Sequence, residues 1–287
     1  MRKTRTSIAL LVSAAAAALL ASVAVAATIT GTDRGERLRG TEFPDTIDAR
    51  GGNDRVRALA GDDSVDAGRG NDHVWAGPGD DTVDGQRGAD VIYGGPGADK
   101  LSGDRGHDLV FGGVGDDQLQ GGLGNDRLHG GDGNDQIDAG PGHDRIAGGR
   151  GNDTEFGGFG NDRIYGNLGQ DVEYGGPGND QMWAIARGDV HPGPNGAVDQ
   201  NGDSLDGGTG DDVIHTRDGE VDRVLCGPGN DTAILDKVDV IVDATPANPN
   251  GSCENVRRAD PKPKKGQTSQ SEPSTDSNGQ TDEPGQH

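Results

Sequence analysis

An acidic residue recurs every nine positions over much of the chain. The series begins at Glu36 and ends at Asp189, and a glycine lies two positions before each Asp without a break from Gly52 to Gly178. A repeat this regular predicts a stacked architecture rather than an ordinary globular core. Two positions after almost every acidic residue stands an apolar one, and this column contains Leu38, Ile47, Val56, Val65, Val74, Val83, Ile92, Leu101, Val110, Leu119, Leu128, Ile137, Ile146, Ile164 and Met182.

Each nine-residue unit divides into a short strand and a turn. In a stretch such as residues 127–129, alternation directs Leu128 inward and its neighbours outward. The six remaining residues are rich in glycine, which adopts positive φ and allows sharp turns. Two units would make one flattened coil of 18 residues with a strand on each side. We therefore predict an all-β fold, a parallel β-roll (β-solenoid) of 18-residue coils, over residues 27–190.

The repeat is interrupted once and then returns with less regular spacing. A Pro/Gly-rich insertion loop is expected at 191–202, followed by a second, shorter and irregular stack with its C-terminal cap at 203–258. Two cysteines, Cys226 and Cys253, are expected to form one disulfide that closes this end. The acidic series resumes at Asp203, Asp212, Asp222, Asp231 and Asp239.

Both ends of the chain differ from the repeat. Residues 1–26 have a basic start, an apolar Ala-rich stretch and a small-x-small site at 24–26, which is the pattern of a secretory signal peptide. A retained membrane anchor is the alternative, and no later segment is apolar enough to span a membrane. Residues 259–287 lack periodicity and are expected to be a disordered tail. We expect a secreted, extracellular protein.

Composition alone gives a different answer. Only 30% of residues are hydrophobic and the formal net charge is −23, a combination typical of disorder. The regular placement of the apolar residues overturns that interpretation. The excess of acid disfavours a nucleic-acid partner, because phosphate would be repelled.

Stacked coils bring aspartates into columns in which like charges repel unless they are neutralised. A hard divalent cation bound by oxygen would neutralise them. Calcium accepts six to eight oxygens in flexible geometry, whereas magnesium requires a tighter octahedron and retains its waters. The spacing therefore favours calcium as the cofactor, in several copies.

Units such as GGLGNDRLH at 121–129 and GGPGNDQMW at 175–183 fit the pattern G-G-x-G-x-D-x-U-x. The chain thus resembles the RTX, or haemolysin-type, calcium-binding repeat, which implies calcium held in the turns by Asp side chains and backbone carbonyls. Glu36, Asp45 and Asp189 lack the preceding glycine and are expected at the ends of the array. A glycine-rich acidic solenoid that ignores calcium is the alternative. The metal-binding positions that the resemblance implies are Asp54, Asp63, Asp72, Asp81, Asp90, Asp99, Asp108, Asp117, Asp126, Asp135, Asp144, Asp153, Asp162, Asp171, Asp180, Asp212 and Asp231.

Sorting the outward residues by coil side predicts two different faces. Thr, Ser, Gln and Asp gather on one side, while the other is expected to carry aromatic residues with arginines two positions earlier. The aromatic side could bind surface glycan or a second copy of the chain, or it could only stabilise an exposed sheet. The candidate partner face contains Trp75, Tyr93, Phe111, Tyr165 and Trp183, with His129 in the same file.

Glu155, Glu173 and His191 interrupt the apolar column at intervals of 18. Buried carboxylates are costly, so these residues form either a small metal or proton site or a place where the strands rotate. We expect rotation, with Phe156 and Tyr174 replacing them in the core.

No HExxH, GxSxG or Cys-His arrangement is present in the sequence, so an enzyme is not expected. The sequence predicts a secreted, non-catalytic calcium-binding protein that folds on binding Ca2+. The alternative is a cell-surface adhesion or envelope-assembly module that uses the aromatic face. An ice-binding solenoid is disfavoured, because the third position of the repeat is mixed rather than a file of Thr.

Overall fold

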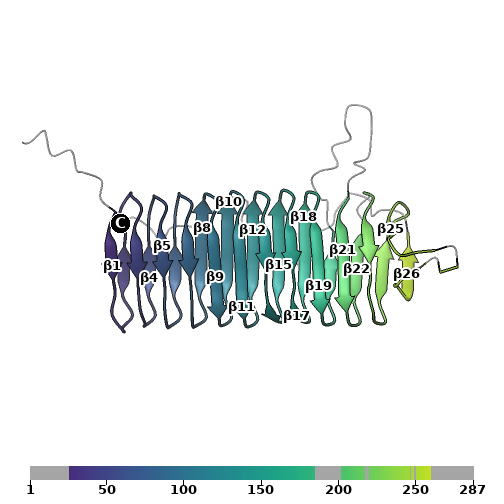
Figure 1. Ribbon diagram of the computed structural model, residues 1–287, viewed down its shortest axis with the longest axis horizontal. Helices are drawn as coiled ribbons and strands as arrows, with labels where there is room; N and C mark the ends of the chain where they lie inside the picture. The colour runs from purple at the N-terminus through teal and green to yellow at the C-terminus, as the bar shows by residue number, and fades with distance from the viewer. Residues whose placement is uncertain (1–25, 185–201, 217–219, 246, 249, 260–287) are drawn as a thin grey trace, which may run out of the picture.

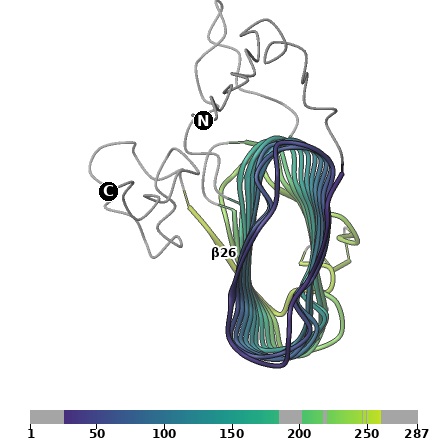
Figure 2. The ribbon, with the colours of Figure 1, turned by 90° about the vertical axis from the view of Figure 1, so that its left-hand side faces the viewer.

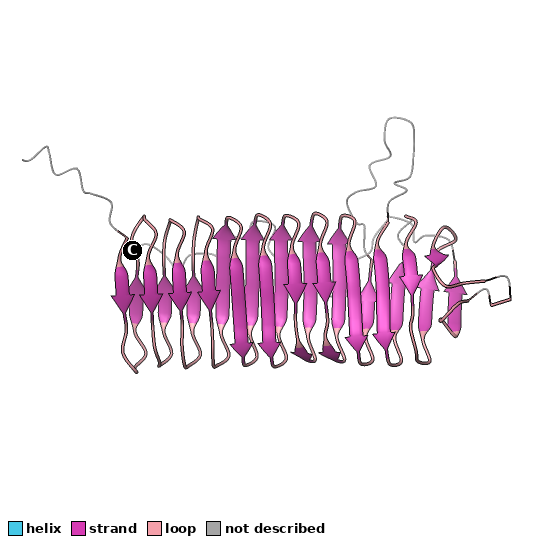
Figure 3. Ribbon diagram, viewed as in Figure 1, coloured by secondary structure: helices cyan, strands magenta, loops and turns pink. Residues whose placement is uncertain are grey.

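The described residues form an elongated parallel β-solenoid. The computed structural model describes residues 26–184, 202–216, 220–245, 247–248 and 250–259, and no helix occurs among them. Strands lie along the two broad sides of the rod and turns along its two edges (Figures 1 and 3). Viewed from the end, successive coils overlay as a flattened ring (Figure 2). The predicted all-β, parallel β-roll class is confirmed.

Two twelve-stranded parallel sheets form the broad sides. Sheet 1 consists, in spatial order, of β1 (Thr28–Thr30), β3 (Thr46–Asp48), β5 (Ser64–Asp66), β7 (Thr82–Asp84), β9 (Lys100–Arg105), β11 (Gln118–Leu123), β13 (Gln136–Asp138), β16 (Thr154–Phe156), β19 (Val172–Pro177), β21 (Ser204–Thr209), β23 (Arg223–Leu225) and β25 (Val240–Ile241). Sheet 2 consists of β2 (Arg37–Arg39), β4 (Arg55–Arg57), β6 (His73–Trp75), β8 (Val91–Pro96), β10 (Leu109–Val114), β12 (Arg127–Asp132), β15 (Arg145–Arg150), β18 (Arg163–Leu168), β20 (Gln181–Trp183), β22 (Val213–Thr216), β24 (Thr232–Leu235) and β26 (Asn255–Arg258). A small third sheet pairs β14 (Pro141–Gly142) with β17 (Phe159–Gly160).

The register between neighbouring strands reproduces the 18-residue period of the sequence. Val110 of β10 lies opposite Leu128 of β12, and the same step relates the regular strands throughout the array. Each strand places its middle residue inward, where the two apolar columns meet in a thin core. These middle residues are almost fully buried from Ile47 to Met182, with Leu205, Ile214 and Val224 continuing the columns.

The sheets continue across the interruption of the repeat. Strand β19 pairs with β21, and β20 with β22, although the backbone partners are 32 residues apart there instead of 18. Most of the expected insertion loop lies outside the described residues. Residues 1–25 of the expected signal peptide and residues 260–287 of the expected tail lie outside them too. Within the described part of the chain, no helix is long and apolar enough to cross a bilayer.

The C-terminal end of the rod is closed by the predicted disulfide. Cys226 and Cys253 are joined, with their Cα atoms 5.2 Å apart, and both residues are buried. The coil period becomes irregular in this region, with steps of 19 and 17 residues between equivalent aspartates. Strand β26 then covers β24 as the last strand of sheet 2.

The expected rotation of the strands at Glu155 and Glu173 is wrong. Both carboxylates remain in the inward column, opposite Ile137 and Leu205 of the neighbouring strands, and both are 0% exposed. Parallel pairing continues without a break through β16 and β19, so the in–out parity of every residue is fixed. Phe156 and Tyr174 consequently face outward, where their rings stack with centroids 4.9 Å apart. His191 lies outside the described residues.

Candidate metal centre

The turns have a backbone that glycine makes possible. In the turn at 94–99, Gly95 and Gly97 have φ of 122° and 147°, which side-chain-bearing residues rarely adopt. Coils also stack so closely that a Cβ on Gly95 would lie against the carbonyl of Gly77 in the preceding coil. The regular glycines thus bring backbone carbonyl oxygens of successive coils close together.

The repeated aspartates join neighbouring coils by hydrogen bonds. The backbone N–H of Asp99 donates to Oδ1 of Asp117, one coil further on, over 2.8 Å, and Asp117 repeats this bond with Asp135. The same bond recurs at both edges of the rod, and all the aspartates involved are buried. One oxygen of each carboxylate is therefore committed to the fold.

The second carboxylate oxygen has no hydrogen-bond partner along most of the array. Asp171 lies in the same column and its Oδ1 accepts the N–H of Asp153, 2.9 Å away. The buried Oδ2 atoms without a hydrogen-bond partner include those of Asp54, Asp63, Asp72, Asp81, Asp90, Asp99, Asp108, Asp117, Asp126, Asp135, Asp144, Asp153, Asp162, Asp180, Asp212 and Asp231. Such buried oxygens without a hydrogen-bond partner are rare in folded proteins, and a bound cation is one way to satisfy them.

A backbone carbonyl lies beside these carboxylate oxygens. The space that a Cβ on Gly103 would fill is 2.6 Å from Oδ2 of Asp108 and 2.8 Å from the carbonyl oxygen of Gly121 in the next coil. The same pair of donors converges at Gly94, Gly112 and Gly130. Where the first position of the turn is alanine (Ala49, Ala58, Ala67, Ala76 and Ala139), a buried methyl group stands there instead. The space beside the Asp Oδ2 and the carbonyl oxygen is therefore wider in the turns that begin with glycine than in those that begin with alanine.

Burial and mutual repulsion raise the pKa of these carboxylic acids. The pKa of Asp117 rises from 3.8 to about 8, first because burial disfavours the charged form and then because Asp135, Asp99 and Asp116 are nearby, against a backbone hydrogen bond that lowers it. The pKa values of Asp90, Asp144 and Asp153 rise to about 8 for the same leading reason. Without a cation, the ionised columns are therefore destabilised.

The first turns are closed differently. Both oxygens of Glu36 accept hydrogen bonds from Thr32, and Asp45 uses Oδ2 to accept the N–H of Thr41. These two residues are thus satisfied by the chain itself, in keeping with their expected place at the end of the array. Asp189, the other expected end residue, lies outside the described residues.

Glu254 ends one column of carboxylates, and the nine-residue spacing does not predict it. Oε2 of Glu254 accepts the N–H of Asp231 over 2.8 Å, 23 residues away instead of 18. Glu254 directly follows Cys253, so the last carboxylate lies beside the disulfide that ties this coil to the preceding one. The only sequence signal was an acidic residue beside a cysteine.

These oxygens fit a calcium ion. Among the described residues, no cluster of three or more His, Cys, Asp or Glu side chains is arranged to hold a metal. The turns instead combine carboxylate and backbone carbonyl oxygens, which are the hard donors that calcium prefers. Asp side chains together with glycine carbonyls would hold the ion, and binding would supply the missing partner of each Oδ2.

The predicted aromatic file is present on sheet 2. The rings of Trp75, Tyr93 and Phe111 stack in sequence, with centroids 6.0 and 5.0 Å apart and nearly parallel planes. Arg57 lies over the Trp75 ring, 5.5 Å from its centroid.

After Ala147 interrupts the file, a second block begins at Tyr165. Tyr165 stacks on Trp183, and Trp183 stacks on His215 across the interruption of the repeat, with centroids 4.6 and 5.3 Å apart. The 18-residue period does not predict His215 in this file, because the insertion places it 32 residues after Trp183.

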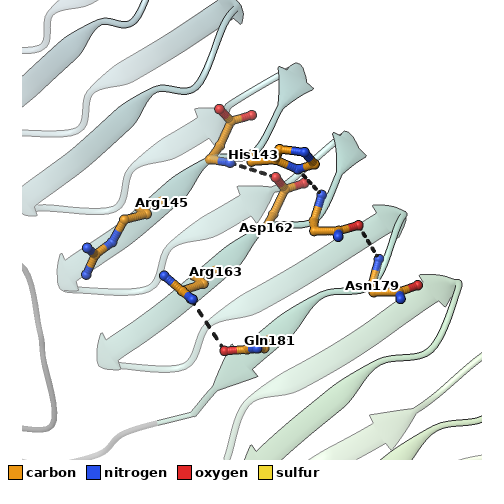
Figure 4. Close-up of a pocket in the computed structure, with 8 residues that line it drawn as sticks. His143, Arg145, Asp162, Arg163, Asn179 and Gln181 are labelled. Carbon is orange, nitrogen blue, oxygen red and sulfur yellow. Dashed lines mark hydrogen bonds between the residues drawn. The ribbon is translucent and has the colours of Figure 1, made fainter.

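A shallow depression lies at one edge of sheet 2 (Figure 4). His143, Asn161 and Asn179 form a chain of bonds there: the N–H of Asn161 donates to Nδ1 of His143 over 2.8 Å, and the N–H of Asn179 donates to Oδ1 of Asn161 over 2.9 Å (Figure 4). Arg163 donates to Gln181 beside them. These polar groups are engaged in coil-to-coil stacking, and no Ser, Thr or Cys is among the residues that line the depression.

Columns of buried carboxylates facing glycine carbonyls define a cation-binding β-solenoid. The chain belongs to the RTX calcium-binding nonapeptide repeat family, whose family model of four copies matches residues 30–65, 57–92, 84–119, 120–155, 148–182 and 199–233.

Among solved structures, the chain is similar to a hyperactive, Ca2+-dependent, β-helical antifreeze protein from an Antarctic bacterium. The two are 19% identical, with a TM-score of 0.32, and the alignment covers 83% of this chain and 93% of that one. None of the curated proteins matches the sequence.

Proposed function

We propose that the protein is a secreted, non-catalytic calcium-binding protein whose coils fold as Ca2+ fills the turns. The observation that carries this proposal is the file of buried Asp Oδ2 atoms without a hydrogen-bond partner. Family membership supports calcium as the ion. The metal ligands proposed are the aspartates from Asp54 to Asp180, with Asp212 and Asp231, together with carbonyls of the adjoining turns.

Coupling between folding and binding follows from the charge of the chain. Two unit charges one strand spacing apart, about 4.8 Å, repel by about 3.5 kcal/mol at an effective dielectric constant of about 20. Repeated along two columns, this repulsion opposes stacking until cations neutralise it. In a cytosol poor in calcium the chain would stay unfolded and competent for export, and extracellular calcium at about millimolar concentration would drive folding.

Direct calcium titration of the purified chain by isothermal calorimetry tests the proposal. We expect multiple Ca2+ ions to bind, and Asp117→Asn to bind fewer, because the amide keeps an oxygen for the Asp99 N–H but removes the charge. Asp116→Asn is the matched control: Asp116 is exposed and its Oδ1 accepts a backbone bond from Asn134 that an amide oxygen can also accept. Absence of calcium binding, or equal loss in the two variants, would contradict the assignment.

A second candidate function is adhesion to surface glycan or self-association through sheet 2. The observation that favours it is the stacked block of Trp75, Tyr93 and Phe111 with Arg57 over its first ring. Flat aromatic stacks flanked by cations suit sugar rings and like surfaces.

Pull-down on cell-wall polymer and sedimentation of the calcium-loaded protein test this second function. Trp75→Ser combined with Tyr93→Ser should abolish the association. Phe156→Ser with Tyr174→Ser, which removes an equally stacked pair from sheet 1, should retain it. Association that survives the first pair of substitutions would exclude the aromatic face as the binding surface.

A further inference from the structure

Two glutamates occupy the core column where every neighbouring coil has an apolar residue. Glu155 of β16 and Glu173 of β19 are direct partners in sheet 1, between Ile137 and Leu205. Both side chains are fully buried. The calcium-binding repeat does not explain these two glutamates, since the other units have no carboxylate at this inward position.

Each glutamate turns back toward the turn of its own unit. A Cβ on Gly148 would touch both Oε1 of Glu155 and Oδ2 of Asp153. One coil on, a Cβ on Gly166 would lie 2.7 Å from Oε1 of Glu173 and 2.6 Å from Oδ2 of Asp171. In each of these turns, a second carboxylate therefore lies beside the first glycine of the turn. In the other glycine turns, one carboxylate oxygen and one carbonyl oxygen lie there.

Glu155 itself lacks any hydrogen-bond partner. Both of its oxygens are buried and unsatisfied, as is Oδ2 of the adjacent Asp153. The charged groups that act on Glu155 are all acidic: Glu173, Asp171, Asp153 and Asp203. Five carboxylates thus lie together in three successive coils. A buried group of like charges requires compensation, and each divalent ion neutralises two of them while supplying the missing contacts.

We propose that Glu155 and Glu173 convert the turns at 148–153 and 166–171 into a reinforced divalent-cation site that binds calcium more tightly than the turns with aspartate alone. This inference rests on the proposed calcium-dependent function and adds that the turns differ in their affinity for calcium. Affinity for calcium rises with the number of charged ligands. Carbonyl oxygens would complete the coordination, because among the described residues no three carboxylates are arranged to hold a single ion.

The position of this site gives it a role in assembly. Strand β19 carries Glu173 and is the last strand of sheet 1 before the interruption, where Asp171 donates its N–H to Asp203 across 32 residues. The turn that fills first as the calcium concentration rises would then be the one that holds the coils on either side of the interruption together. Calcium would be lost last from the middle of the rod.

The test is competition for Ca2+ between the full-length protein and a chromophoric chelator, which resolves the tightest class of ions. We expect Glu155→Gln with Glu173→Gln to weaken that class by about tenfold or more. Asp132→Asn with Asp138→Asn removes the same two charges from exposed positions nearby and should leave the tight class unchanged. Glu155→Leu with Glu173→Leu, which restores an apolar column, gives a folded form that should also lack the tight class.

An unchanged tight class in the glutamine variant would overturn the inference and indicate that protons neutralise the glutamates. The two proposals fail separately. Loss of binding in Asp117→Asn together with an unchanged glutamine variant would leave the proposed function standing and remove only the reinforced site. A wild-type chain that binds no calcium would remove both.

Discussion

Chelation of calcium at pH 8 is expected to abolish the β-signal of the far-ultraviolet circular dichroism spectrum. Most of the buried aspartates have one oxygen bonded across coils and one without a hydrogen-bond partner, so the metal-free stack contains files of desolvated negative charge. Desolvation and repulsion between coils add over the whole rod, which is why we expect loss of most of the structure rather than a local change. Calcium added back in excess over the chelator should restore the spectrum.

Acidification should partly replace calcium in this experiment. The pKa of Asp117 is about 8 in the folded, metal-free chain and 3.8 as its ordinary value, and Asp90 and Asp144 behave alike. Between these two values the folded state binds more protons than the unfolded state, so the free energy of unfolding falls as pH rises through this window. The metal-free chain should therefore be more structured near pH 5 than at pH 8. Calcium should reverse that order, because protons compete for the same oxygens.

Magnesium at equal ionic strength is the control for the chelation experiment and for the acidification experiment. Magnesium requires a near-ideal octahedron and gives up water reluctantly, so it should restore less of the signal than calcium. A spectrum at pH 8 that does not change on chelation would show that the coils tolerate ionised columns, and the proposed coupling of folding to calcium would then be wrong.

Gly113→Ala is expected to lower the free energy of unfolding by about 3 kcal/mol, even in saturating calcium. Gly113 has a φ of 126°, and a Cβ there would meet the backbone of Gly95, 2.9 Å from its carbonyl carbon, in addition to the carbonyl oxygen itself. Backbone atoms cannot swing away as a side chain would, so the two coils must separate. The hydrogen bond from the Gly97 N–H to the Val114 carbonyl joins the same two coils next to this contact. Urea unfolding, with hydrogen exchange at Gly97, measures the effect.

Gly51→Ala is the matched control. Gly51 is buried, yet the nearest atom to a Cβ there is the carbonyl oxygen of Arg69 at 3.5 Å, which is ordinary contact. We expect a change within about 0.5 kcal/mol. Equal destabilisation by the two substitutions would mean that glycine acts through the unfolded chain and not through the close stacking of coils.

Most of the fold could be predicted from the sequence because the repeat fixes each residue's environment by its position in the period. The inward column and the aromatic file follow from the spacing. The pairing of Cys226 with Cys253 follows because the chain has only two cysteines. The predictions fail where the period fails. His215 and Glu254 continue the aromatic and acidic files, but insertions of irregular length separate them from their neighbours.

The error at Glu155 has a different cause. Local residue preference disfavours a carboxylate in the core, and that argument led to the expectation of a rotated strand. Hydrogen bonding to β13 and β19 fixes the parity of β16 on both sides, so a single unfavourable side chain cannot turn the strand over. The sheet therefore keeps the glutamate inside and leaves its charge to be compensated there.

By itself, the sequence determined the coil length, the inward and outward faces and the acidic residue type in every turn, since these depend only on periodicity and on the alternation of side chains along a strand. The tertiary structure alone decided which carboxylate oxygen is bonded and which is not. It also decided that the coils on either side of the interruption adjoin, and that Glu155 meets Glu173 beside Asp153 and Asp171. These features arise from contacts between residues 18 or 32 positions apart, and the geometry of such contacts is set by the stacking of whole coils.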